Sequence, residues 1–125
     1  MKILVLDDNK GFRDEVLSIL ARNGHEGDGA GRAVDAIPLV ESGRYDFVLV
    51  DYHMPEHDGL WFMQNVKRPR HTKALLVTAH VNNHLINKMF DVGACGYIIK
   101  PFEEADLLRH LEFHAGGALR MSAGE

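Results

Sequence analysis

Four short runs of apolar residues divide this chain, and three of them end directly in a charged side chain. The runs occupy residues 3–6, 47–50, 74–77 and 97–99. Short apolar runs bounded by polar residues and turn signals are typical of strands buried on both faces of a parallel sheet. The first run is followed by Asp7 and Asp8, the second by Asp51 and the last by Lys100.

Apolar residues at helical spacing fill the segments between these runs. The predicted helices cover the stretch from Asp8 to Asn23–Gly24, 33–42, the stretch from Asp58–Gly59 to Arg68–Pro69, the stretch from Asn82 or Asn83 to Gly93, and 102–113. We expect Pro38 to kink the second helix or to shorten it. A further strand is expected within 25–31, where three glycines predict a short, irregular or edge strand.

Composition indicates one ordinary globular domain. The chain has 125 residues, 46% hydrophobic and 26% charged, which is enough to bury a proper core. Its net charge of −4 argues against nonspecific nucleic-acid binding, which needs a basic face. No apolar stretch is long enough for a membrane helix, and Met1 leads directly into the first strand, so we expect a cytoplasmic protein. Cys95, between Ala94 and Gly96, is predicted to be a small buried hydrophobe rather than a reactive thiol.

The charged residues that follow the strands predict a site. Parallel strands all point the same way, so the side chains that follow them collect along one edge, where open α/β sheets bind ligands. Neighbouring carboxylates repel one another unless a cation joins them, and their hard oxygen atoms suit Mg²⁺. The sequence therefore predicts that Asp7, Asp8 and Asp51 form a magnesium site, with Lys100 nearby.

The complete set of motifs resembles the receiver domain of bacterial two-component response regulators, through about residue 113. The motifs are Asp7–Asp8, Asp51, Met54–Pro55 with Asp58–Gly59, Thr78–Ala79 and Lys100–Pro101–Phe102. The resemblance implies a doubly wound, flavodoxin-like α/β fold, in which a five-stranded parallel sheet of order 2-1-3-4-5 is flanked by five helices. We expect a receiver domain over 1–115 and a flexible C-terminal tail over 116–125.

The resemblance also implies the roles of individual residues. Asp51 would accept a phosphoryl group from a phosphohistidine on a partner histidine kinase or phosphotransfer protein. Asp7 and Asp8 would hold Mg²⁺ together with Asp51 and the backbone carbonyl of His53. The metal would offset negative charge on the phosphoryl oxygens.

A second group of residues would bind the phosphoryl group and change conformation in response to it. Lys100 would pair with one phosphoryl oxygen, Thr78 would donate its hydroxyl to another, and Ala79 would line the same pocket. Tyr97 would turn inward when Thr78 moves to the phosphate, which would reshape the face made by the fourth helix, the fifth strand and the fifth helix. A downstream partner would bind this face, near Lys88 and Arg109. The Lys100–Pro101 peptide bond is expected to be cis.

Two other classes of protein are alternatives to a phosphorylation switch. Aspartyl-phosphate hydrolases carry a second Asp two residues after the nucleophile, but this chain has His53 after Asp51 and Asn9 after Asp7. A pseudo-receiver used only for docking would not need the complete set of charged residues. We therefore expect a receiver that catalyses only its own Mg²⁺-dependent phosphorylation and dephosphorylation, and is not otherwise an enzyme.

Simpler roles stay open for several of these residues. Asp7–Asp8 could cap the helix that follows, and Asp58–Gly59 could be a turn and helix start rather than part of a site. Thr78 could be only a strand-end hydroxyl, and Tyr97 a static core aromatic.

Two histidines lie at positions where histidine is uncommon in receiver domains. His53 and His80 are each placed two residues after a motif residue, so both are expected to rim the phosphoryl pocket. Imidazole ordinarily titrates at about 6.5, so we predict that these two residues tune the lifetime of the phosphoryl group and make it depend on pH. No spacing motif supports a transition-metal site at the pair. The sequence names neither the cognate kinase nor the output.

Overall fold

Five parallel strands form one sheet in the order β2-β1-β3-β4-β5. The computed structural model describes residues 1–80 and 82–124, with side chains through residue 116. Its elements are β1 Lys2–Leu6, α1 Lys10–Arg22, β2 Glu26–Ala30, α2 Ala33–Glu41, β3 Phe47–Val50, α3 Gly59–Asn65, β4 Lys73–Thr78, α4 Asn83–Asp91, β5 Ala94–Ile99 and α5 Glu104–Gly124. The expected doubly wound α/β fold is confirmed.

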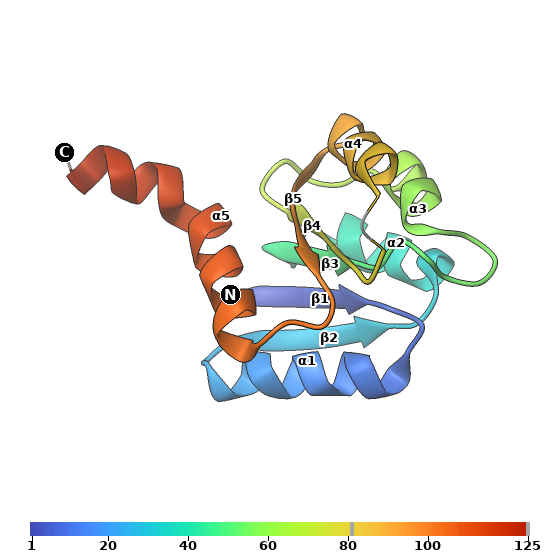
Figure 1. The fold of residues 1–125 in the computed structure, drawn as a ribbon, viewed down its shortest axis with the longest axis horizontal. Helices are drawn as coiled ribbons and strands as arrows, with labels where there is room; N and C mark the ends of the chain where they lie inside the picture. The colour runs from blue at the N-terminus through green and yellow to red at the C-terminus, as the bar shows by residue number, and fades with distance from the viewer. Residues whose placement is uncertain (81, 125) are drawn as a thin grey trace.

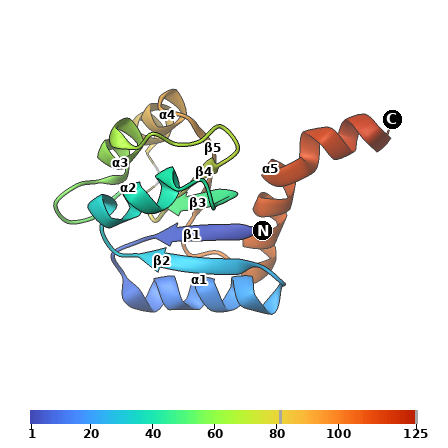
Figure 2. The ribbon, with the colours of Figure 1, turned by 180° about the vertical axis from the view of Figure 1, so that it is seen from behind.

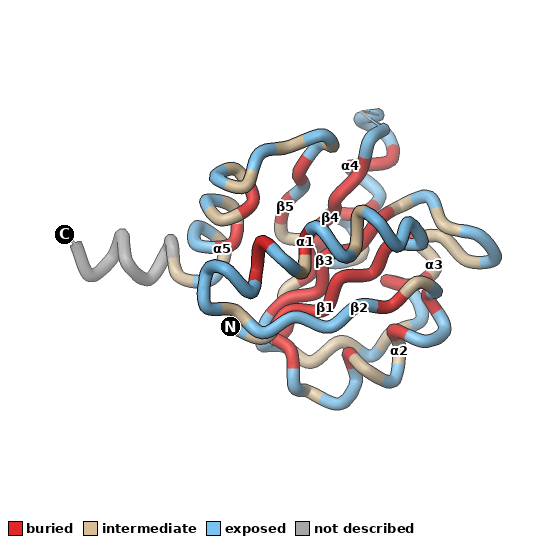
Figure 3. The backbone as a smooth tube through the Cα atoms, turned by 90° about the horizontal axis from the view of Figure 1, so that it is seen from below, coloured by how far each residue is buried: buried red, intermediate tan, exposed pale blue. Residues whose placement is uncertain are grey.

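The helices divide into two layers, one on each face of the sheet (Figures 1 and 2). Side chains that alternate along β1 separate into two cores, because successive strand residues point to opposite faces. Ile3 and Val5 pack with residues of α1 and α5, whereas Leu4 and Leu6 pack with residues of α2, α3 and α4. The central strands are therefore buried on both sides, which the tube in Figure 3 shows in red.

Strand β2 is confirmed as an edge strand, with all but its last residue exposed. Two of its glycines lie close to side chains of α1. A Cβ atom on Gly27 would lie 2.7 Å from Leu17 Cδ2, and one on Gly29 would lie 3.2 Å from Arg13 Nε. A larger residue at either position would require these flexible side chains to shift.

Several elements differ from their predicted course or bounds. Helix α3 ends at Asn65 instead of Arg68, because Val66 is extended and the next backbone N–H, that of Lys67, donates to Glu41 Oε2. Helix α2 continues through the exposed Pro38. Strand β5 is longer than predicted and begins at Ala94, since Gly96 keeps the ladder with β4 despite having no side chain.

Helix α5 is assigned as far as Gly124, beyond the predicted end at Phe113. The division into a domain over 1–115 and a flexible tail over 116–125 stays a prediction; Glu125 and the side chains from 117 onward lie outside the described residues. Among the helices in the described part of the chain, none combines the length and apolar character that crossing a membrane requires.

Candidate functional site

Three carboxylates meet at the carboxyl end of the sheet. Asp7 follows β1 and Asp51 follows β3, and these strands are hydrogen-bonded neighbours. One oxygen atom from each of Asp7, Asp8 and Asp51 lies within 4.8 Å of the others. Asp7 and Asp51 are 2% and 8% exposed, while Asp8 is open to solvent. The structure therefore brings together the three carboxylates that the sequence predicts to be neighbours.

Lys100 brings a positive charge to the same place from β5. Its Nζ donates a hydrogen bond of 2.6 Å to Asp7 Oδ2 and lies 3.8 Å from Asp51 Oδ1. The ammonium also lies 4.1 Å from the centre of the Phe12 ring, which meets Phe102 edge to face. An aromatic face attracts a cation, so Phe12 helps to hold the lysine beside the carboxylates. The peptide bond after Lys100 is cis, as expected.

The surroundings of Asp51 change its acidity. Burial and the negative charge of Asp7 raise the pKa of Asp51 to about 6, although the ammonium of Lys100 opposes this rise. Burial favours the neutral carboxyl because the low-dielectric interior solvates charge poorly. Asp51 is therefore mostly ionised at neutral pH. Any further positive charge nearby would stabilise the ionised form.

Asp7 does not cap helix α1, which answers one of the simpler alternatives. The cap is Asn9, whose side chain accepts the backbone N–H of Phe12 at 2.9 Å. Asp7 Oδ1 instead accepts the N–H of Asn9, and its Oδ2 accepts the lysine ammonium. The Asp7 carboxylate is thus fixed by two donors and stays buried.

The loop between β3 and α3 closes tightly behind Asp51. Asp58 caps α3 by accepting the N–H of Trp61 at 2.8 Å, so Asp58–Gly59 is a helix start, as the simpler alternative held. The N–H of Gly59 donates to the Tyr52 carbonyl. A Cβ atom at Gly59 would lie 2.6 Å from the Asp51 carbonyl oxygen, so no larger residue fits this turn without moving the backbone of Asp51.

Thr78 and Tyr97 occupy different environments. Thr78 is fully buried at the end of β4, and its Oγ1 accepts the backbone N–H of His80 at 3.1 Å. Ala79, the next residue, is exposed beside the site. Tyr97 is 39% exposed and its ring meets Phe90 edge to face at 6.3 Å, so it is not a core aromatic.

His53 and His80 come together, although they belong to different loops. Their ring centres are 4.1 Å apart, and both side chains line a pocket that Ala79 also borders. The two imidazoles therefore lie against each other, while their place on the rim of a phosphoryl pocket stays a prediction. Their effect on a phosphoryl group, and its dependence on pH, stay predictions.

Sequence reasoning missed two supporting residues. The Arg13 guanidinium donates to the backbone carbonyl of Asp7 at 2.7 Å, and Phe12 lies beneath Lys100. Arg13 follows Asp7 by six residues and Phe12 precedes Lys100 by a long separation, so spacing carried no signal. Cys95 is half-buried, and burial raises the pKa of its thiol, which agrees with the expected unreactive residue.

The donor set suits a divalent cation. Three carboxylates within one small region place at least two negative charges beside a single ammonium, and Lys100 already donates to Asp7. Hard oxygen donors, one of them exposed and two buried, are the ligands that Mg²⁺ takes while keeping some of its water. Asp7, Asp8 and Asp51 therefore fit a magnesium ion.

Comparisons with known proteins agree with this geometry. Residues 3–112 match the model of the response regulator receiver domain family. The chain is 32% identical to the chemotaxis protein CheY-3 of Vibrio cholerae over 116 residues, which cover 90% of this chain and 89% of that protein. It is also 30% identical to the transcriptional regulatory protein PdtaR of Mycobacterium tuberculosis, covering 89% of this chain and 55% of that protein.

Solved structures give the same answer for the fold. Chemotaxis protein CheY4 of Vibrio cholerae superposes with a TM-score of 0.83 at 28% identity, covering 89% of this chain and 95% of that one. A BeF3-activated DrrB receiver domain superposes with a TM-score of 0.76 at 27% identity, covering 89% and 93%. Receiver domains generally bind Mg²⁺ at such an acidic cluster and interact with histidine kinases or phosphotransfer proteins. With a matching family model over residues 3–112 and this arrangement of carboxylates and lysine, the chain belongs to the response regulator receiver domain family.

Proposed function

We propose that Asp51 is the phosphoacceptor of this receiver domain. The observation that carries the proposal is the placement of a buried, mostly ionised carboxylate beside two other carboxylates and an ammonium. A carboxylate oxygen of Asp51 attacks the phosphorus of a phosphohistidine, the new P–O bond forms, and the P–N bond to the imidazole breaks. Asp51→Asn removes the negative oxygen that this attack needs.

Asp7, Asp8, Asp51 and the backbone carbonyl of His53 would hold Mg²⁺ in this proposal. A bound magnesium ion supplies charge neutralisation for the oxygens of the phosphoryl group. Asp7 holds Lys100 near Asp51, so the ammonium is within reach of a group attached there. The chain catalyses no reaction other than its own phosphorylation and dephosphorylation, and it works in the cytoplasm.

The test is phosphorylation by acetyl phosphate, read by intact-mass spectrometry. We expect one added phosphate in the presence of Mg²⁺, and none after chelation or in Asp51→Asn. Asp28→Asn is a matched control, because Asp28 lies in the edge strand and hydrogen-bonds Tyr45. Equal labelling of the Asp51→Asn protein would assign the phosphate to another residue.

We also propose that phosphorylation is read out on the face made by α4, β5 and α5. Thr78 donates its hydroxyl to the phosphoryl group, and Tyr97 moves inward as Thr78 shifts. This is a shift between two populations, driven by contacts that exist only with the phosphoryl group present. Tyr97 begins from a half-exposed position against Phe90, which leaves it free to move.

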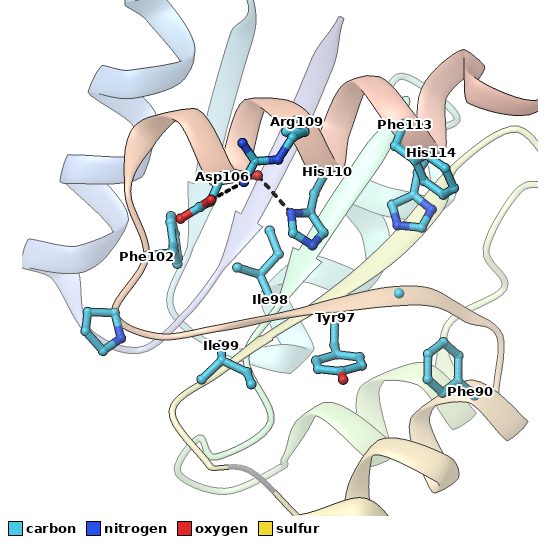
Figure 4. Close-up of a pocket in the computed structure, with 12 residues that line it drawn as sticks. Phe90, Tyr97, Ile98, Ile99, Phe102, Asp106, Arg109, His110, Phe113 and His114 are labelled. Atoms are coloured by element: carbon cyan, nitrogen blue, oxygen red, sulfur yellow. Dashed lines mark hydrogen bonds and ion pairs between the residues drawn. The ribbon is translucent and has the colours of Figure 1, made fainter. Parts of the chain in front are cut away.

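The same face offers room for a partner. A groove of about 640 Å³ lies between β5 and α5, lined by Tyr97, Phe90, Phe113 and imidazoles of α5 (Figure 4). Its charged groups include Arg109, which pairs with Asp106 one turn away. Phe90, Tyr97, Ile99 and Phe113 are four of the large hydrophobic residues that stay exposed. A downstream partner binding there, near Lys88 and Arg109, would cover them.

Beryllofluoride with Mg²⁺ tests this readout without the instability of an acyl phosphate. We expect amide chemical shifts to move both around Asp51 and through α4, β5 and α5, and to do so less in Thr78→Val. Shifts confined to the surroundings of Asp51 would show that phosphoryl binding does not change the face made by α4, β5 and α5.

His53 and His80 are proposed to alter how long the phosphoryl group lasts, since their rings lie 4.1 Å apart and they follow Asp51 and Thr78 by two residues each. The half-life of the phosphoprotein in His53→Asn with His80→Gln should differ from that of the parent protein. Equal half-lives would show that the two histidines are surface residues with no effect on the phosphoryl group.

A further inference from the structure

Basic residues gather at the other end of the sheet, far from the carboxylates. The segment 67–73 joins α3 to β4 and holds four lysines and arginines within seven residues. In Figure 1 it is the yellow-green connection that enters β4 at its amino end. With the exposed Arg44 just before β3, these residues form what we call the basic surface: Arg44, Lys67, Arg68, Arg70 and Lys73.

Two loops are joined to make this surface continuous. Thr72 Oγ1 donates to the Tyr45 carbonyl at 2.6 Å, and both residues are buried. An imidazole nitrogen of His71 lies 2.8 Å from the Gly43 carbonyl oxygen. Arg44 stands between these two contacts in the chain, so it lies beside segment 67–73.

The backbone of segment 67–73 is fixed at several points. The Arg68 guanidinium donates to the carbonyls of Thr72, at 2.5 Å, and of Gly93, at 3.2 Å. The backbone N–H of Lys67 donates to the carboxylate of Glu41 at 2.8 Å. A partner would meet a surface whose backbone is already ordered, which lowers the entropic cost of binding.

Among the residues whose side chains are described, the cations of the basic surface differ from most other lysines and arginines, because no ion pair joins them to a carboxylate. The lysines and arginines that form ion pairs are Lys2, Lys10, Arg22, Arg32, Lys100 and Arg109. Over the residues whose side chains the structure describes, no ion pair involves any of the five cations of the basic surface.

A purely structural role explains only part of this arrangement. Helices α2 and α3 end on this side of the sheet without a basic residue in the last turn, and cations there favour the exposed carbonyl groups. Arg68 fits that role, because it binds two backbone carbonyls. The exposed side chains of Lys67 and Arg70 have no such contact in the described structure, so they are available to a ligand.

We propose that the basic surface binds an acidic segment of a partner protein. Clustered cations complement clustered carboxylates and speed their encounter at low salt. Nucleic acid fits less well, because Tyr45, whose ring Arg44 contacts, is buried and the whole chain carries a net charge of −4. A membrane also fits less well, since segment 67–73 has no large apolar residue to insert.

This binding lies at the end of the sheet opposite to Asp51 and does not depend on the proposed phosphotransfer. The test uses fluorescence anisotropy of the full chain with a short labelled Glu-rich peptide, a labelled RNA of equal charge and anionic vesicles. Lys67→Gln with Arg70→Gln is compared with Lys10→Gln with Arg32→Gln, which removes the same charge elsewhere. Thermal unfolding of each variant is measured in parallel.

We expect saturable peptide binding that weakens about tenfold in Lys67→Gln with Arg70→Gln and weakens with added salt, since two exposed charge pairs are lost. The other double variant should bind the peptide as tightly as the parent does. The unfolding temperature of both variants should equal that of the parent. Absence of peptide binding, equal weakening in both variants, or tighter binding of RNA or vesicles would each overturn the proposal. So would a lowered unfolding temperature with unchanged binding, which would assign these cations to the helix ends.

Discussion

The two ends of the sheet use charge in opposite ways. At the carboxyl end, Asp7 and Asp51 are buried, and Lys100 is held between them and an aromatic ring. At the amino end, Lys67 and Arg70 are exposed and lie in a loop whose contacts are made by other groups. Burial amplifies electrostatic interactions because the interior screens them poorly, whereas water and salt weaken them at the surface.

This comparison has consequences that can be measured. Changing a charge at the carboxyl end should alter stability and acidity strongly. Changing a charge at the amino end should alter binding while leaving stability nearly constant.

The largest effect is expected for Asp51→Asn in the absence of metal. Because the pKa of Asp51 rises to about 6 on folding, the folded protein binds more protons than the unfolded one between about pH 4 and pH 6. The free energy of unfolding contributed by this group therefore falls as pH rises through that window. At neutral pH, Asp51→Asn should be about 3 kcal/mol more stable than the parent, and the gain should vanish near pH 4.

Urea unfolding across this pH range, in the presence of a chelator, measures the difference. Asp91→Asn is the control, because Asp91 is exposed in α4, outside the carboxylate cluster, and should change stability little. Parallel curves for the parent and Asp51→Asn would show that burial does not perturb this carboxyl.

The next largest effect is expected for Gly59→Ala. Its new Cβ would lie 2.6 Å from the Asp51 carbonyl oxygen and 3.0 Å from Tyr52 Cα, so the backbone behind Asp51 must shift. We expect a loss of about 2 kcal/mol by urea unfolding. Gly11→Ala is the matched control: Gly11 is exposed in α1, where alanine is the better helix former. A Gly59→Ala protein as stable as the parent would mean that the turn relaxes freely.

Thr72→Val tests the buried contact that supports the basic surface. It removes a hydroxyl that donates to the Tyr45 carbonyl and keeps the shape of the side chain. We expect a loss of about 1 kcal/mol in the free energy of unfolding. Ser42→Ala also removes a hydroxyl that donates to a backbone carbonyl, but at an exposed position, and should cost less. Equal costs would show that burial does not strengthen this hydrogen bond.

The smallest effect on stability is expected for Lys67→Gln with Arg70→Gln. These side chains have no carboxylate partner among the described residues, so the free energy of unfolding should change by less than about 0.5 kcal/mol. Chemical unfolding measured at low and at high salt tests this. If the free energy of unfolding fell by more than about 1 kcal/mol at low salt but not at high salt, charges at the amino end would also stabilise the fold, and the two ends of the sheet would not differ in this respect.

The sequence alone determined the order of strands and helices and the residues at the site. Short continuous apolar runs and segments of helical period can be read directly, and charges after parallel strands must share one edge of the sheet. This is why Asp7, Asp8, Asp51 and Lys100 could be expected together. The edge position of β2 was also predictable, because its glycines weaken any buried strand.

Only the tertiary structure decided how these residues are held. The stacking of Lys100 on Phe12, the support of Asp7 by Arg13, and the contact between His53 and His80 join segments whose separation in the chain carries no period. The end of α3 at Asn65 likewise depends on Glu41, which belongs to another helix. Local patterns record what each segment buries, whereas the acidity of Asp51 depends on which segments pack around it.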